Sequence, residues 1–589
     1  MKAITLIIIL LCVYALFYKF YASFIISKIL VIDPKRQTPA FKLRNDYDYK
    51  PTNKWVLFGH HFAAIAGAGP LVGPVLAAQF GYLPGFLWIL IGAVLAGAVH
   101  DMVILFISVR YDGSSLTEIA KNEAGKLVGT STGIAVFFII ITALAGLAMV
   151  VVNALSESAW GTFTIAATIP IAMFVGIYME KIRPQKITEA SIIGVILVLL
   201  AVIYGEKIAK SDLAKYFIYS KNTISVSLAL YGMLASILPV WLLLAPRDYL
   251  SSYLKIGTVA LLAIGILFVN PTINFPAFTE FINGGGPIIP GKIWPYVCIT
   301  IACGAISGFH SLISSGTTPK MIMNEKEIRT IAYGAMLTEG FVALMALIAA
   351  TVLSYGDYFA INTPPEVFKK LGVSVTNLPQ LSAEIGEKLE GRTGGAVSLA
   401  VGMAQIFSQI PFMKNILSYW YHFAIMFEAL FILTTIDAGT RVARYLTQET
   451  LGKIYKPLGD INNFGAVIFT SFLVSFLWGW MLIAGNVRTI WPMFGTANQL
   501  LSAIALAIAT TYIIKRTKKI YSLVTLVPFI FMITTTATAG IMNIKDNYLP
   551  MRNTTGYINV FLTVIILILA FIITISSLKI WIKESIKIN

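Results

Sequence analysis

Two histidines and an aspartate stand inside apolar segments, where an ionisable group is costly. His100 and Asp101 are adjacent in the segment 85–109, and His310 lies in the segment 293–316. Ionisable groups at membrane depth are rare and are functional candidates by default. Histidine exchanges its proton near neutral pH, so we expect these three groups to relay protons. Adjacent side chains on a helix point about 100° apart, so His100 and Asp101 need not pair, and a structural ion pair of Asp101 is the alternative.

Three further ionisable groups are candidates for the same proton relay. His60 and His61 open the apolar segment 56–80, and Glu428 lies well inside the segment 417–437. Either histidine could exchange protons with water near the membrane surface. The alternative for the two histidines is an interfacial pair that only hydrogen-bonds the start of its helix. Glu428 is deeper, and a structural role explains it less readily.

Hydroxyl and amide side chains recur inside two of the apolar segments. Ser311, Ser314 and Ser315 are spaced i, i+3, i+4, so they share one helix face. Their oxygens could coordinate Na+ or line a water path for protons. Ordinary packing of serine between membrane helices is the alternative. For Asn498 and Gln499 we expect hydrogen bonds between helices.

Four charged residues near the ends of two apolar segments could form a gate. Arg247 and Asp248 end one segment, and Asp437 and Arg441 end another. Both pairs have a plain alternative, which is a boundary ion pair at the membrane surface. We expect Asp437 to meet Arg441 there. Glu339 is another carboxylate in an apolar segment, and the pattern alone assigns it no role.

The apolar segment 56–80 is long enough to cross a bilayer, but its middle is interrupted. It reads Gly-Ala-Gly-Pro at 67–70 and Gly-Pro at 73–74. Proline removes a backbone donor and glycine weakens a helix, so we expect a break there. A break in hydrocarbon is tolerated where it lines a cavity or is buried in protein, and broken helices bind substrate in many transporters. A close-packed kink without a ligand is the alternative. The substrate-binding candidates are Ala66, Gly67, Ala68, Gly69, Pro70 and Gly73.

Composition places the chain in a membrane. It has 589 residues, of which 57% are hydrophobic and 12% charged, so we predict an all-α polytopic membrane protein. The net charge of +16 comes from Lys and Arg in short loops, as the positive-inside rule requires, which argues against a nucleic-acid partner. The cysteines, Cys12, Cys298 and Cys303, lie in apolar segments without a disulfide framework or zinc-type spacing. We expect no cofactor and no metal.

Hydropathy and loop charge predict about fifteen spans, with the N-terminus outside and the C-terminus cytoplasmic. The spans from 56–80 to 189–205 form a unit of five whose first span begins on the cytoplasmic side. The spans from 223–244 to 417–437 form a unit of five whose first span begins on the outer side. Two such units of opposite orientation are typical of inverted-repeat transporters. The basic loop 206–222 is the exception to the charge rule. The predicted division is 1–55 (first span and basic loop), 56–222 and 223–445 (two five-helix repeats, the second with an extracellular region 355–415), and 446–589 (a four-helix extension).

The second repeat should open with its own interrupted helix. The segment 223–244 is the candidate, and Leu238 and Pro239 at its interruption are the expected substrate contacts. The short apolar stretch 394–410 predicts a re-entrant or surface helix.

Six blocks of sequence resemble one family. In order, they are FGHHFAAIAGAGPLVGPVLAAQ (58–79), GAVHDMVILFISVRYDGSSL (97–116), LPVWLLLAPRDYLSSY (238–253), ISGFHSLISSGTTPK (306–320), FEALFILTTIDAGTRVARY (427–445) and WPMFGTANQLL (491–501). They are similar to the signature blocks of the carbon starvation protein A (CstA) family. The blocks are long, and they run from residue 58 to beyond residue 500.

The resemblance implies a fold and a site. The family is placed in the amino acid–polyamine–organocation superfamily, which implies a LeuT-like 5+5 inverted-repeat core. By that likeness, carbonyls from Ala64 to Gly69 would meet Ser314 and Ser315 at an ion site. The substrate would lie between the breaks of 56–80 and 223–244, its carboxylate held by backbone N–H groups.

The resemblance also implies a function in a prokaryotic cell membrane. Family members are associated with uptake of pyruvate or of peptides, coupled to protons where this is known. We therefore expect a non-enzymatic importer of a small carboxylate, pyruvate first and short peptides second, with H+ favoured over Na+. A homo-oligomer is compatible with this. A membrane sensor that binds a metabolite is the alternative of another class, and an intramembrane enzyme or a channel fits less well.

Overall fold

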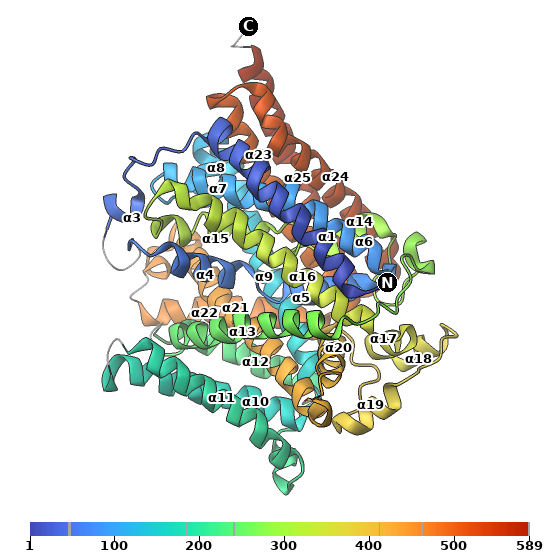
Figure 1. Ribbon diagram of the computed structural model, residues 1–589. Coiled ribbons are helices and arrows are strands. Elements are labelled where there is room, and N and C mark those ends of the chain that lie inside the picture. The colour runs from blue at the N-terminus through green and yellow to red at the C-terminus, as the bar shows by residue number, and fades with distance from the viewer. Residues whose placement is uncertain (45–48, 184–185, 240–241, 412, 461–462, 587–589) are drawn as a thin grey trace. The chain divides into compact units, whose positions relative to one another are not determined.

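The computed structural model describes residues 1–44, 49–183, 186–239, 242–411, 413–460 and 463–586 (Figure 1). Within these ranges the regular elements are helices, accompanied by two isolated bridges. Eleven of the helices are long and apolar enough to cross a membrane. The pair α4 (Lys54–Ile65) and α5 (Gly69–Ala77) passes the same test together as a span bent by 46°, which gives twelve. The chain is therefore a multi-pass membrane protein, and the fifteen spans are not confirmed.

The chain forms two compact units, each built from stretches far apart in the sequence. Unit 1 comprises Met1–Ile4, Ile140–Phe275 and Ile348–Ile490, and unit 2 comprises Thr5–Ile139, Pro276–Leu347 and Trp491–Asn589. The expected division at 55, 222 and 445 is based on the order and orientation of the spans, whereas these units are defined by compact packing. The expected division therefore stays a prediction.

Unit 2 contains the broken span α4–α5 and most of the buried histidines. The interruption follows from its sequence: Asn53 caps the start of α4, the helix ends at Ile65, and Pro70 stands in the first turn of α5. Proline is tolerated there because the N–H it lacks would have no helical partner. The other main helices of this unit are α1 (Ala3–Leu16), α6 (Tyr82–Gly92), α7 (Ala98–Arg110), α8 (Leu116–Ala124), α14 (Ile293–Thr300), α15 (Gly308–Ser314), α24 (Leu523–Met542) and α25 (Thr554–Ile586).

The segment 293–316 is not the single span we expected. Helix α14 ends at Thr300 and α15 begins at Gly308, with non-helical backbone between them. The linking residues read Ile-Ala-Cys-Gly-Ala-Ile-Ser, which is apolar and holds a single glycine and no proline. Because the run is as hydrophobic as a helix interior, hydropathy alone could not reveal this second break.

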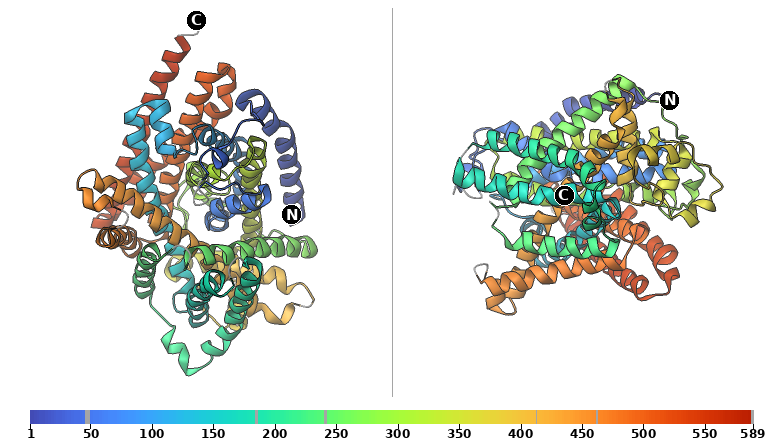
Figure 2. Two further views of the ribbon diagram at one scale, coloured as in Figure 1. Left: turned by 90° about the vertical axis from the view of Figure 1, so that its left-hand side faces the viewer. Right: turned by 90° about the horizontal axis from the view of Figure 1, so that it is seen from below.

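Unit 1 holds a second set of helices, among which α10 and α11 pair along their lengths (Figures 1 and 2). The indole Nε1 of Trp160 on α10 donates to the carbonyl of Val202 on α11 at 2.7 Å. The main helices are α10 (Ala159–Ile177), α11 (Ile187–Ala209), α12 (Lys221–Ile237), α13 (Leu244–Val269), α17 (Tyr355–Asn362), α19 (Leu378–Ile385), α20 (Ala396–Ser408), α21 (Leu417–Gly452) and α22 (Phe464–Ala484). Three long helices continue across the division between the units: α9 (Lys126–Leu155), α16 (Ala335–Val352) and α23 (Val487–Arg516).

Three expectations for unit 1 are corrected. The segment 223–244 is not one span: α12 ends at Ile237, and a new helix, α13, starts at Leu244. Pro246 is tolerated in α13 because it falls in the first turn. Helix α21 runs to Gly452, beyond the expected end of its span. The stretch 394–410 is helical as α20, but its residues are mostly buried, so it is not a surface helix.

Candidate functional site

Four titratable side chains form a buried chain inside unit 2. His100 and Asp101 lie on α7, His310 on α15 and Glu339 on α16, and all four are fully buried. Nδ1 of His100 lies 2.7 Å from Oδ1 of Asp101, and Nδ1 of His310 lies 3.0 Å from Oδ2 of the same carboxylate. Nε2 of His310 lies 3.1 Å from Oε2 of Glu339. The His310 ring therefore stands between two carboxylates.

This arrangement can hold and pass a proton. A carboxylate at each ring nitrogen favours the doubly protonated imidazolium of His310, and each N–H then faces an acceptor. Asp101 bridges two imidazoles, so a proton on either ring meets the same negative charge. Oε1 of Glu339, the oxygen that does not face His310, is buried without a hydrogen-bond donor among the described residues, and it can take up a proton.

The fold brings three of the residues predicted for a proton relay into contact. Sequence reasoning chose His100, Asp101 and His310 but gave Glu339 no role. The reasoning that adjacent residues need not pair was sound for an ideal helix, yet His100 and Asp101 do pair here. A signal for Glu339 was present: it is an isolated carboxylate within AMLTEGFVALMAL, inside a span.

The two broken helices of unit 2 touch at their breaks. A Cβ added to Gly69 would lie 2.6 Å from Cβ of Cys303, and one added to Gly73 would lie 2.5 Å from the carbonyl oxygen of Thr300. Real Cβ atoms do not approach that closely, so only glycine fits at either position. The partner of the first break within this unit is therefore the unforeseen second break, between α14 and α15.

Two amides from α23 satisfy the backbone of the second break. The Asn498 side-chain oxygen accepts from the Phe309 N–H at 3.0 Å, and its nitrogen donates to Ser307 Oγ at 3.0 Å. Nε2 of Gln499 donates to the carbonyls of Cys298 at 3.1 Å and Ile306 at 3.3 Å. Non-helical backbone at membrane depth survives only where such partners exist. The expected inter-helix hydrogen bonding of Asn498 and Gln499 is confirmed.

Replacing Gln499 with Leu is expected to lower stability by about 1–3 kcal/mol, because two buried carbonyls lose their donor. The thermal unfolding temperature of the purified protein in detergent measures this. Ser502→Ala is the matched control, since among the described residues this hydroxyl donates to a carbonyl of its own helix. Equal unfolding temperatures for Gln499→Leu and wild type would contradict the role assigned to Gln499.

The remaining site candidates of unit 2 are spread around this centre. His61 is buried and its Nδ1 lies 2.8 Å from Thr318 Oγ1, whereas His60 is on the exposed side of α4. Ser311 Oγ donates to the carbonyl of Gly308 at 2.6 Å. Ser315 Oγ donates to the carbonyl of Ser311 at 2.6 Å and accepts from the backbone of α8. Ser314 Oγ is buried without a hydrogen-bond partner among the described residues.

The expected gate residues lie in unit 1, and they pair differently from the expectation. Nη1 of Arg247 lies 3.3 Å from Oδ2 of Asp437, which also accepts from the Tyr231 hydroxyl at 2.7 Å. Arg441 instead donates to the carbonyls of Ala235 and Leu238, where α12 ends. The Asp437–Arg441 surface pair is therefore wrong: Asp437 is buried, and Arg441 caps a helix end. The Asp248 side chain lies outside the described part of the chain.

Two other predicted positions of unit 1 stand apart from this ion pair. Glu428 is buried on α21, and neither carboxylate oxygen has a hydrogen-bond partner among the described residues. It belongs to the unit that does not contain the histidine relay. Pro239 is exposed just beyond the end of α12.

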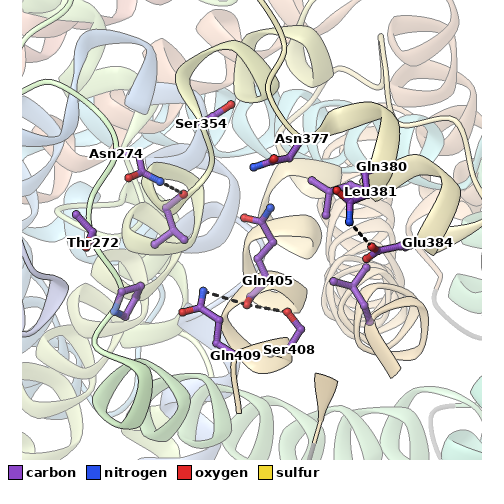
Figure 3. Close-up of a pocket in the computed structure, with 13 residues that line it drawn as sticks. Thr272, Asn274, Ser354, Asn377, Gln380, Leu381, Glu384, Gln405, Ser408 and Gln409 are labelled. Atoms are coloured by element: carbon purple, nitrogen blue, oxygen red, sulfur yellow. Dashed lines mark hydrogen bonds between the residues drawn. The ribbon is translucent and has the colours of Figure 1, made fainter. Parts of the chain in front are cut away.

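Unit 1 also has a surface cavity of about 500 Å³ that the sequence did not indicate (Figure 3). Amide and hydroxyl groups dominate its wall, and several already bond to one another. Gln380 donates to Glu384 at 2.7 Å, and Ser408 donates to the carbonyl of Gln405 at 3.0 Å. The labelled polar residues are Thr272, Asn274, Ser354, Asn377, Gln380, Glu384, Gln405, Ser408 and Gln409.

Comparison with known proteins identifies the family. A family model described as "Carbon starvation protein CstA" matches residues 2–539. The chain belongs to this family. A "Peptide transporter CstA" of Bacillus subtilis (strain 168) is 50% identical over 99% of this chain and 97% of its own length. The "Pyruvate/proton symporter BtsT" of Escherichia coli (strain K12) is 44% identical over 91% of this chain and 81% of its own length. The CstA family assignment therefore makes this chain one of a family of transporters.

The similarity of this chain to solved structures is weaker than its similarity to these sequences. A manganese transporter of Eremococcus coleocola, crystallised with an aromatic bis-isothiourea substituted compound, covers 89% of this chain and 94% of its own, with a TM-score of 0.42 and 11% identity. A TM-score at this level carries no argument about this chain. The expected superfamily and the LeuT-like core consequently stay predictions.

Proposed function

We propose that this chain is a proton-coupled importer of a small carboxylate, with pyruvate as the first candidate substrate. The observation that carries the proposal is the buried chain His100–Asp101–His310–Glu339. Such groups are expensive at membrane depth and typical of proton pathways. The family relationship to a protein named as a pyruvate/proton symporter supports the same reading.

The coupling ion is proposed to be H+ rather than Na+. The hydroxyls of Ser311 and Ser315 already donate to backbone carbonyls of their own segment. Hard oxygen ligands for Na+ would have to come from these groups and from the carbonyls near Ala64 and Gly67. Binding Na+ would therefore require these serine hydroxyls to leave their present hydrogen bonds. The titratable groups can take up a proton without such a change.

The substrate carboxylate is proposed to bind at the first break. The backbone N–H groups of Ala68 and Gly69 at the start of α5 offer a positive helix end for an anion. The N–H groups of Ala66 and Gly67 donate to carbonyls of α4, and Pro70 has no N–H. Because Gly69 and Gly73 contact the second break, the backbone at the start of α5 lies beside the end of α14. A peptide C-terminus presents the same carboxylate, and the 50% identity to a protein named as a peptide transporter keeps short peptides as the second candidate substrate.

Uptake into proteoliposomes tests the proposal directly. Labelled pyruvate and a labelled dipeptide are supplied separately under an imposed pH gradient and under a sodium gradient. We expect accumulation of one substrate under the pH gradient alone, since only the protons are coupled. Accumulation driven by sodium would overturn the choice of ion. Binding of substrate without accumulation under either gradient would favour a metabolite sensor.

A further inference from the structure

A thiol, an imidazole and a carboxylate meet next to the second break of unit 2. Cys303 lies in the break, His310 on α15 and Glu339 on α16, and their metal-binding atoms all lie within 4.8 Å of one another. All three side chains are buried. This set could not be found from spacing along the chain, because the three residues come from different elements, without the close spacing of known metal motifs.

The carboxylate of this set faces the imidazole with one oxygen and has its other oxygen unsatisfied. Oε2 of Glu339 lies 3.1 Å from Nε2 of His310, and Oε1 is buried without a hydrogen-bond partner among the described residues. The Cys303 thiol donates to Ser307 Oγ at 3.5 Å, and its sulfur also faces the His310 ring. Buried polar atoms are usually paired or coordinate a metal, so these three atoms are suited to a shared cation.

The ring nitrogen of His310 that faces away from this set contacts a carboxylate, as is typical of histidines that bind metals. Nδ1 lies 3.0 Å from Asp101, whose second oxygen contacts His100. A histidine that ligates a metal almost always directs its other ring nitrogen to a carboxylate or a carbonyl, which fixes the ring and the tautomer. Asp101 therefore directs Nε2 of His310 toward Glu339.

We propose that Cys303, His310 and Glu339 form a binding site for a divalent transition-metal ion of the zinc class. Thiolate sulfur and imidazole nitrogen select such ions over Mg²⁺ or Ca²⁺. One thiolate and one carboxylate balance the two positive charges, as a buried site requires. Donors around tetrahedral zinc stand about 3.5 Å apart, so closing the set takes roughly 1 Å of movement, and the fourth position is open to water.

Binding of the ion displaces protons. Cys303 must lose its thiol proton and His310 any proton on Nε2, and both leave to water. The bound ion then occupies Nε2 of His310 and the Glu339 carboxylate, two groups that also belong to the proposed proton pathway. A further consequence, which rests on the proposed function, is that zinc inhibits proton-driven uptake.

Cobalt(II) tests the site itself, because a thiolate ligand gives cobalt a charge-transfer band in the near ultraviolet. The purified full chain is titrated with cobalt chloride, and bound metal is counted by elemental analysis. We expect one cobalt per chain, with the band present in wild type, lost in Cys303→Ser and kept in Cys298→Ser. Cys298 is the matched control, since it is a second buried cysteine of the same broken segment and not part of the set. A wild type without the band, or a band that survives in Cys303→Ser, would overturn the site.

Zinc inhibition of uptake then tests the consequence separately. We expect Cys303→Ser to raise the half-inhibitory zinc concentration at least tenfold, and Cys298→Ser to match wild type. Cobalt binding as expected without zinc inhibition would uphold the site and refute its link to the relay. If no gradient drives uptake in any variant, the proposed function fails, while the cobalt spectrum still decides the site.

Discussion

Replacing Asp101 with Asn is expected to abolish proton-driven uptake while the protein still reaches the membrane. The Asp101 carboxylate contacts both His100 and His310 and is fully buried. A carboxamide has nearly the same shape but no charge, so neither imidazole can be held as the cation. Removing one partner of a buried charge pair also costs about 3–5 kcal/mol. Uptake of labelled substrate under a pH gradient should fall to that of empty vesicles.

Two comparisons separate a lost proton step from a damaged fold. Asp112→Asn makes the same chemical change just after α7, where Asp112 forms an exposed pair with Lys42. Such surface pairs contribute about 0–1 kcal/mol, so uptake should be unchanged. Exchange of labelled for unlabelled substrate needs no net proton movement, and it should persist in Asp101→Asn. Accumulation at the wild-type level in Asp101→Asn would contradict the relay.

Replacing Gly69 with Ala is expected to abolish uptake by separating the two breaks. The new Cβ would lie 2.6 Å from Cβ of Cys303 and closer still to its sulfur. Overpacking of this kind typically costs about 1–3 kcal/mol. The thermal unfolding temperature and the uptake rate should therefore fall together. Gly59→Ala on α4 is the control, because a Cβ there meets nothing within 4 Å.

A second-site change tells whether this contact is the cause. Cys303→Gly removes both atoms that the new methyl group would strike, so the double variant Gly69→Ala with Cys303→Gly should regain stability over Gly69→Ala alone. Gly73→Ala should not be rescued in this way, because its clash is with the backbone carbonyl of Thr300. If Gly69→Ala alone unfolds and transports like wild type, the close approach of the two breaks is wrong.

The sequence predicted what local chemistry controls. Apolar runs indicated a multi-pass membrane protein, and the Gly-Ala-Gly-Pro run at 67–70 located the first break, because both signals act over a few residues. The second break was missed because its residues are apolar and lack proline. What permits it comes from far along the chain, where Asn498 and Gln499 supply the hydrogen bonds.

The site was predicted in the same uneven way. The high free-energy cost of an ionisable group inside an apolar segment singled out Asp101 and His310. Their approach to Glu339 and Cys303 depends on the tertiary fold. Asp437 was assigned to the nearby Arg441, whereas its partner is Arg247 on another helix. Pairings between distant elements depend on tertiary packing, which periodicity and hydropathy do not encode.

The two amides on α23 also determine how the second break can move. Because Asn498 binds the Phe309 N–H of α15 and Gln499 binds carbonyls of α14 and of the linking residues, the end of α14, the break and the start of α15 are tied to the same turn of α23. These three segments must shift as one rigid body. The Phe309 amide should therefore exchange its hydrogen with solvent as slowly as the amides in the middle of α23, although it lies beside an interrupted helix.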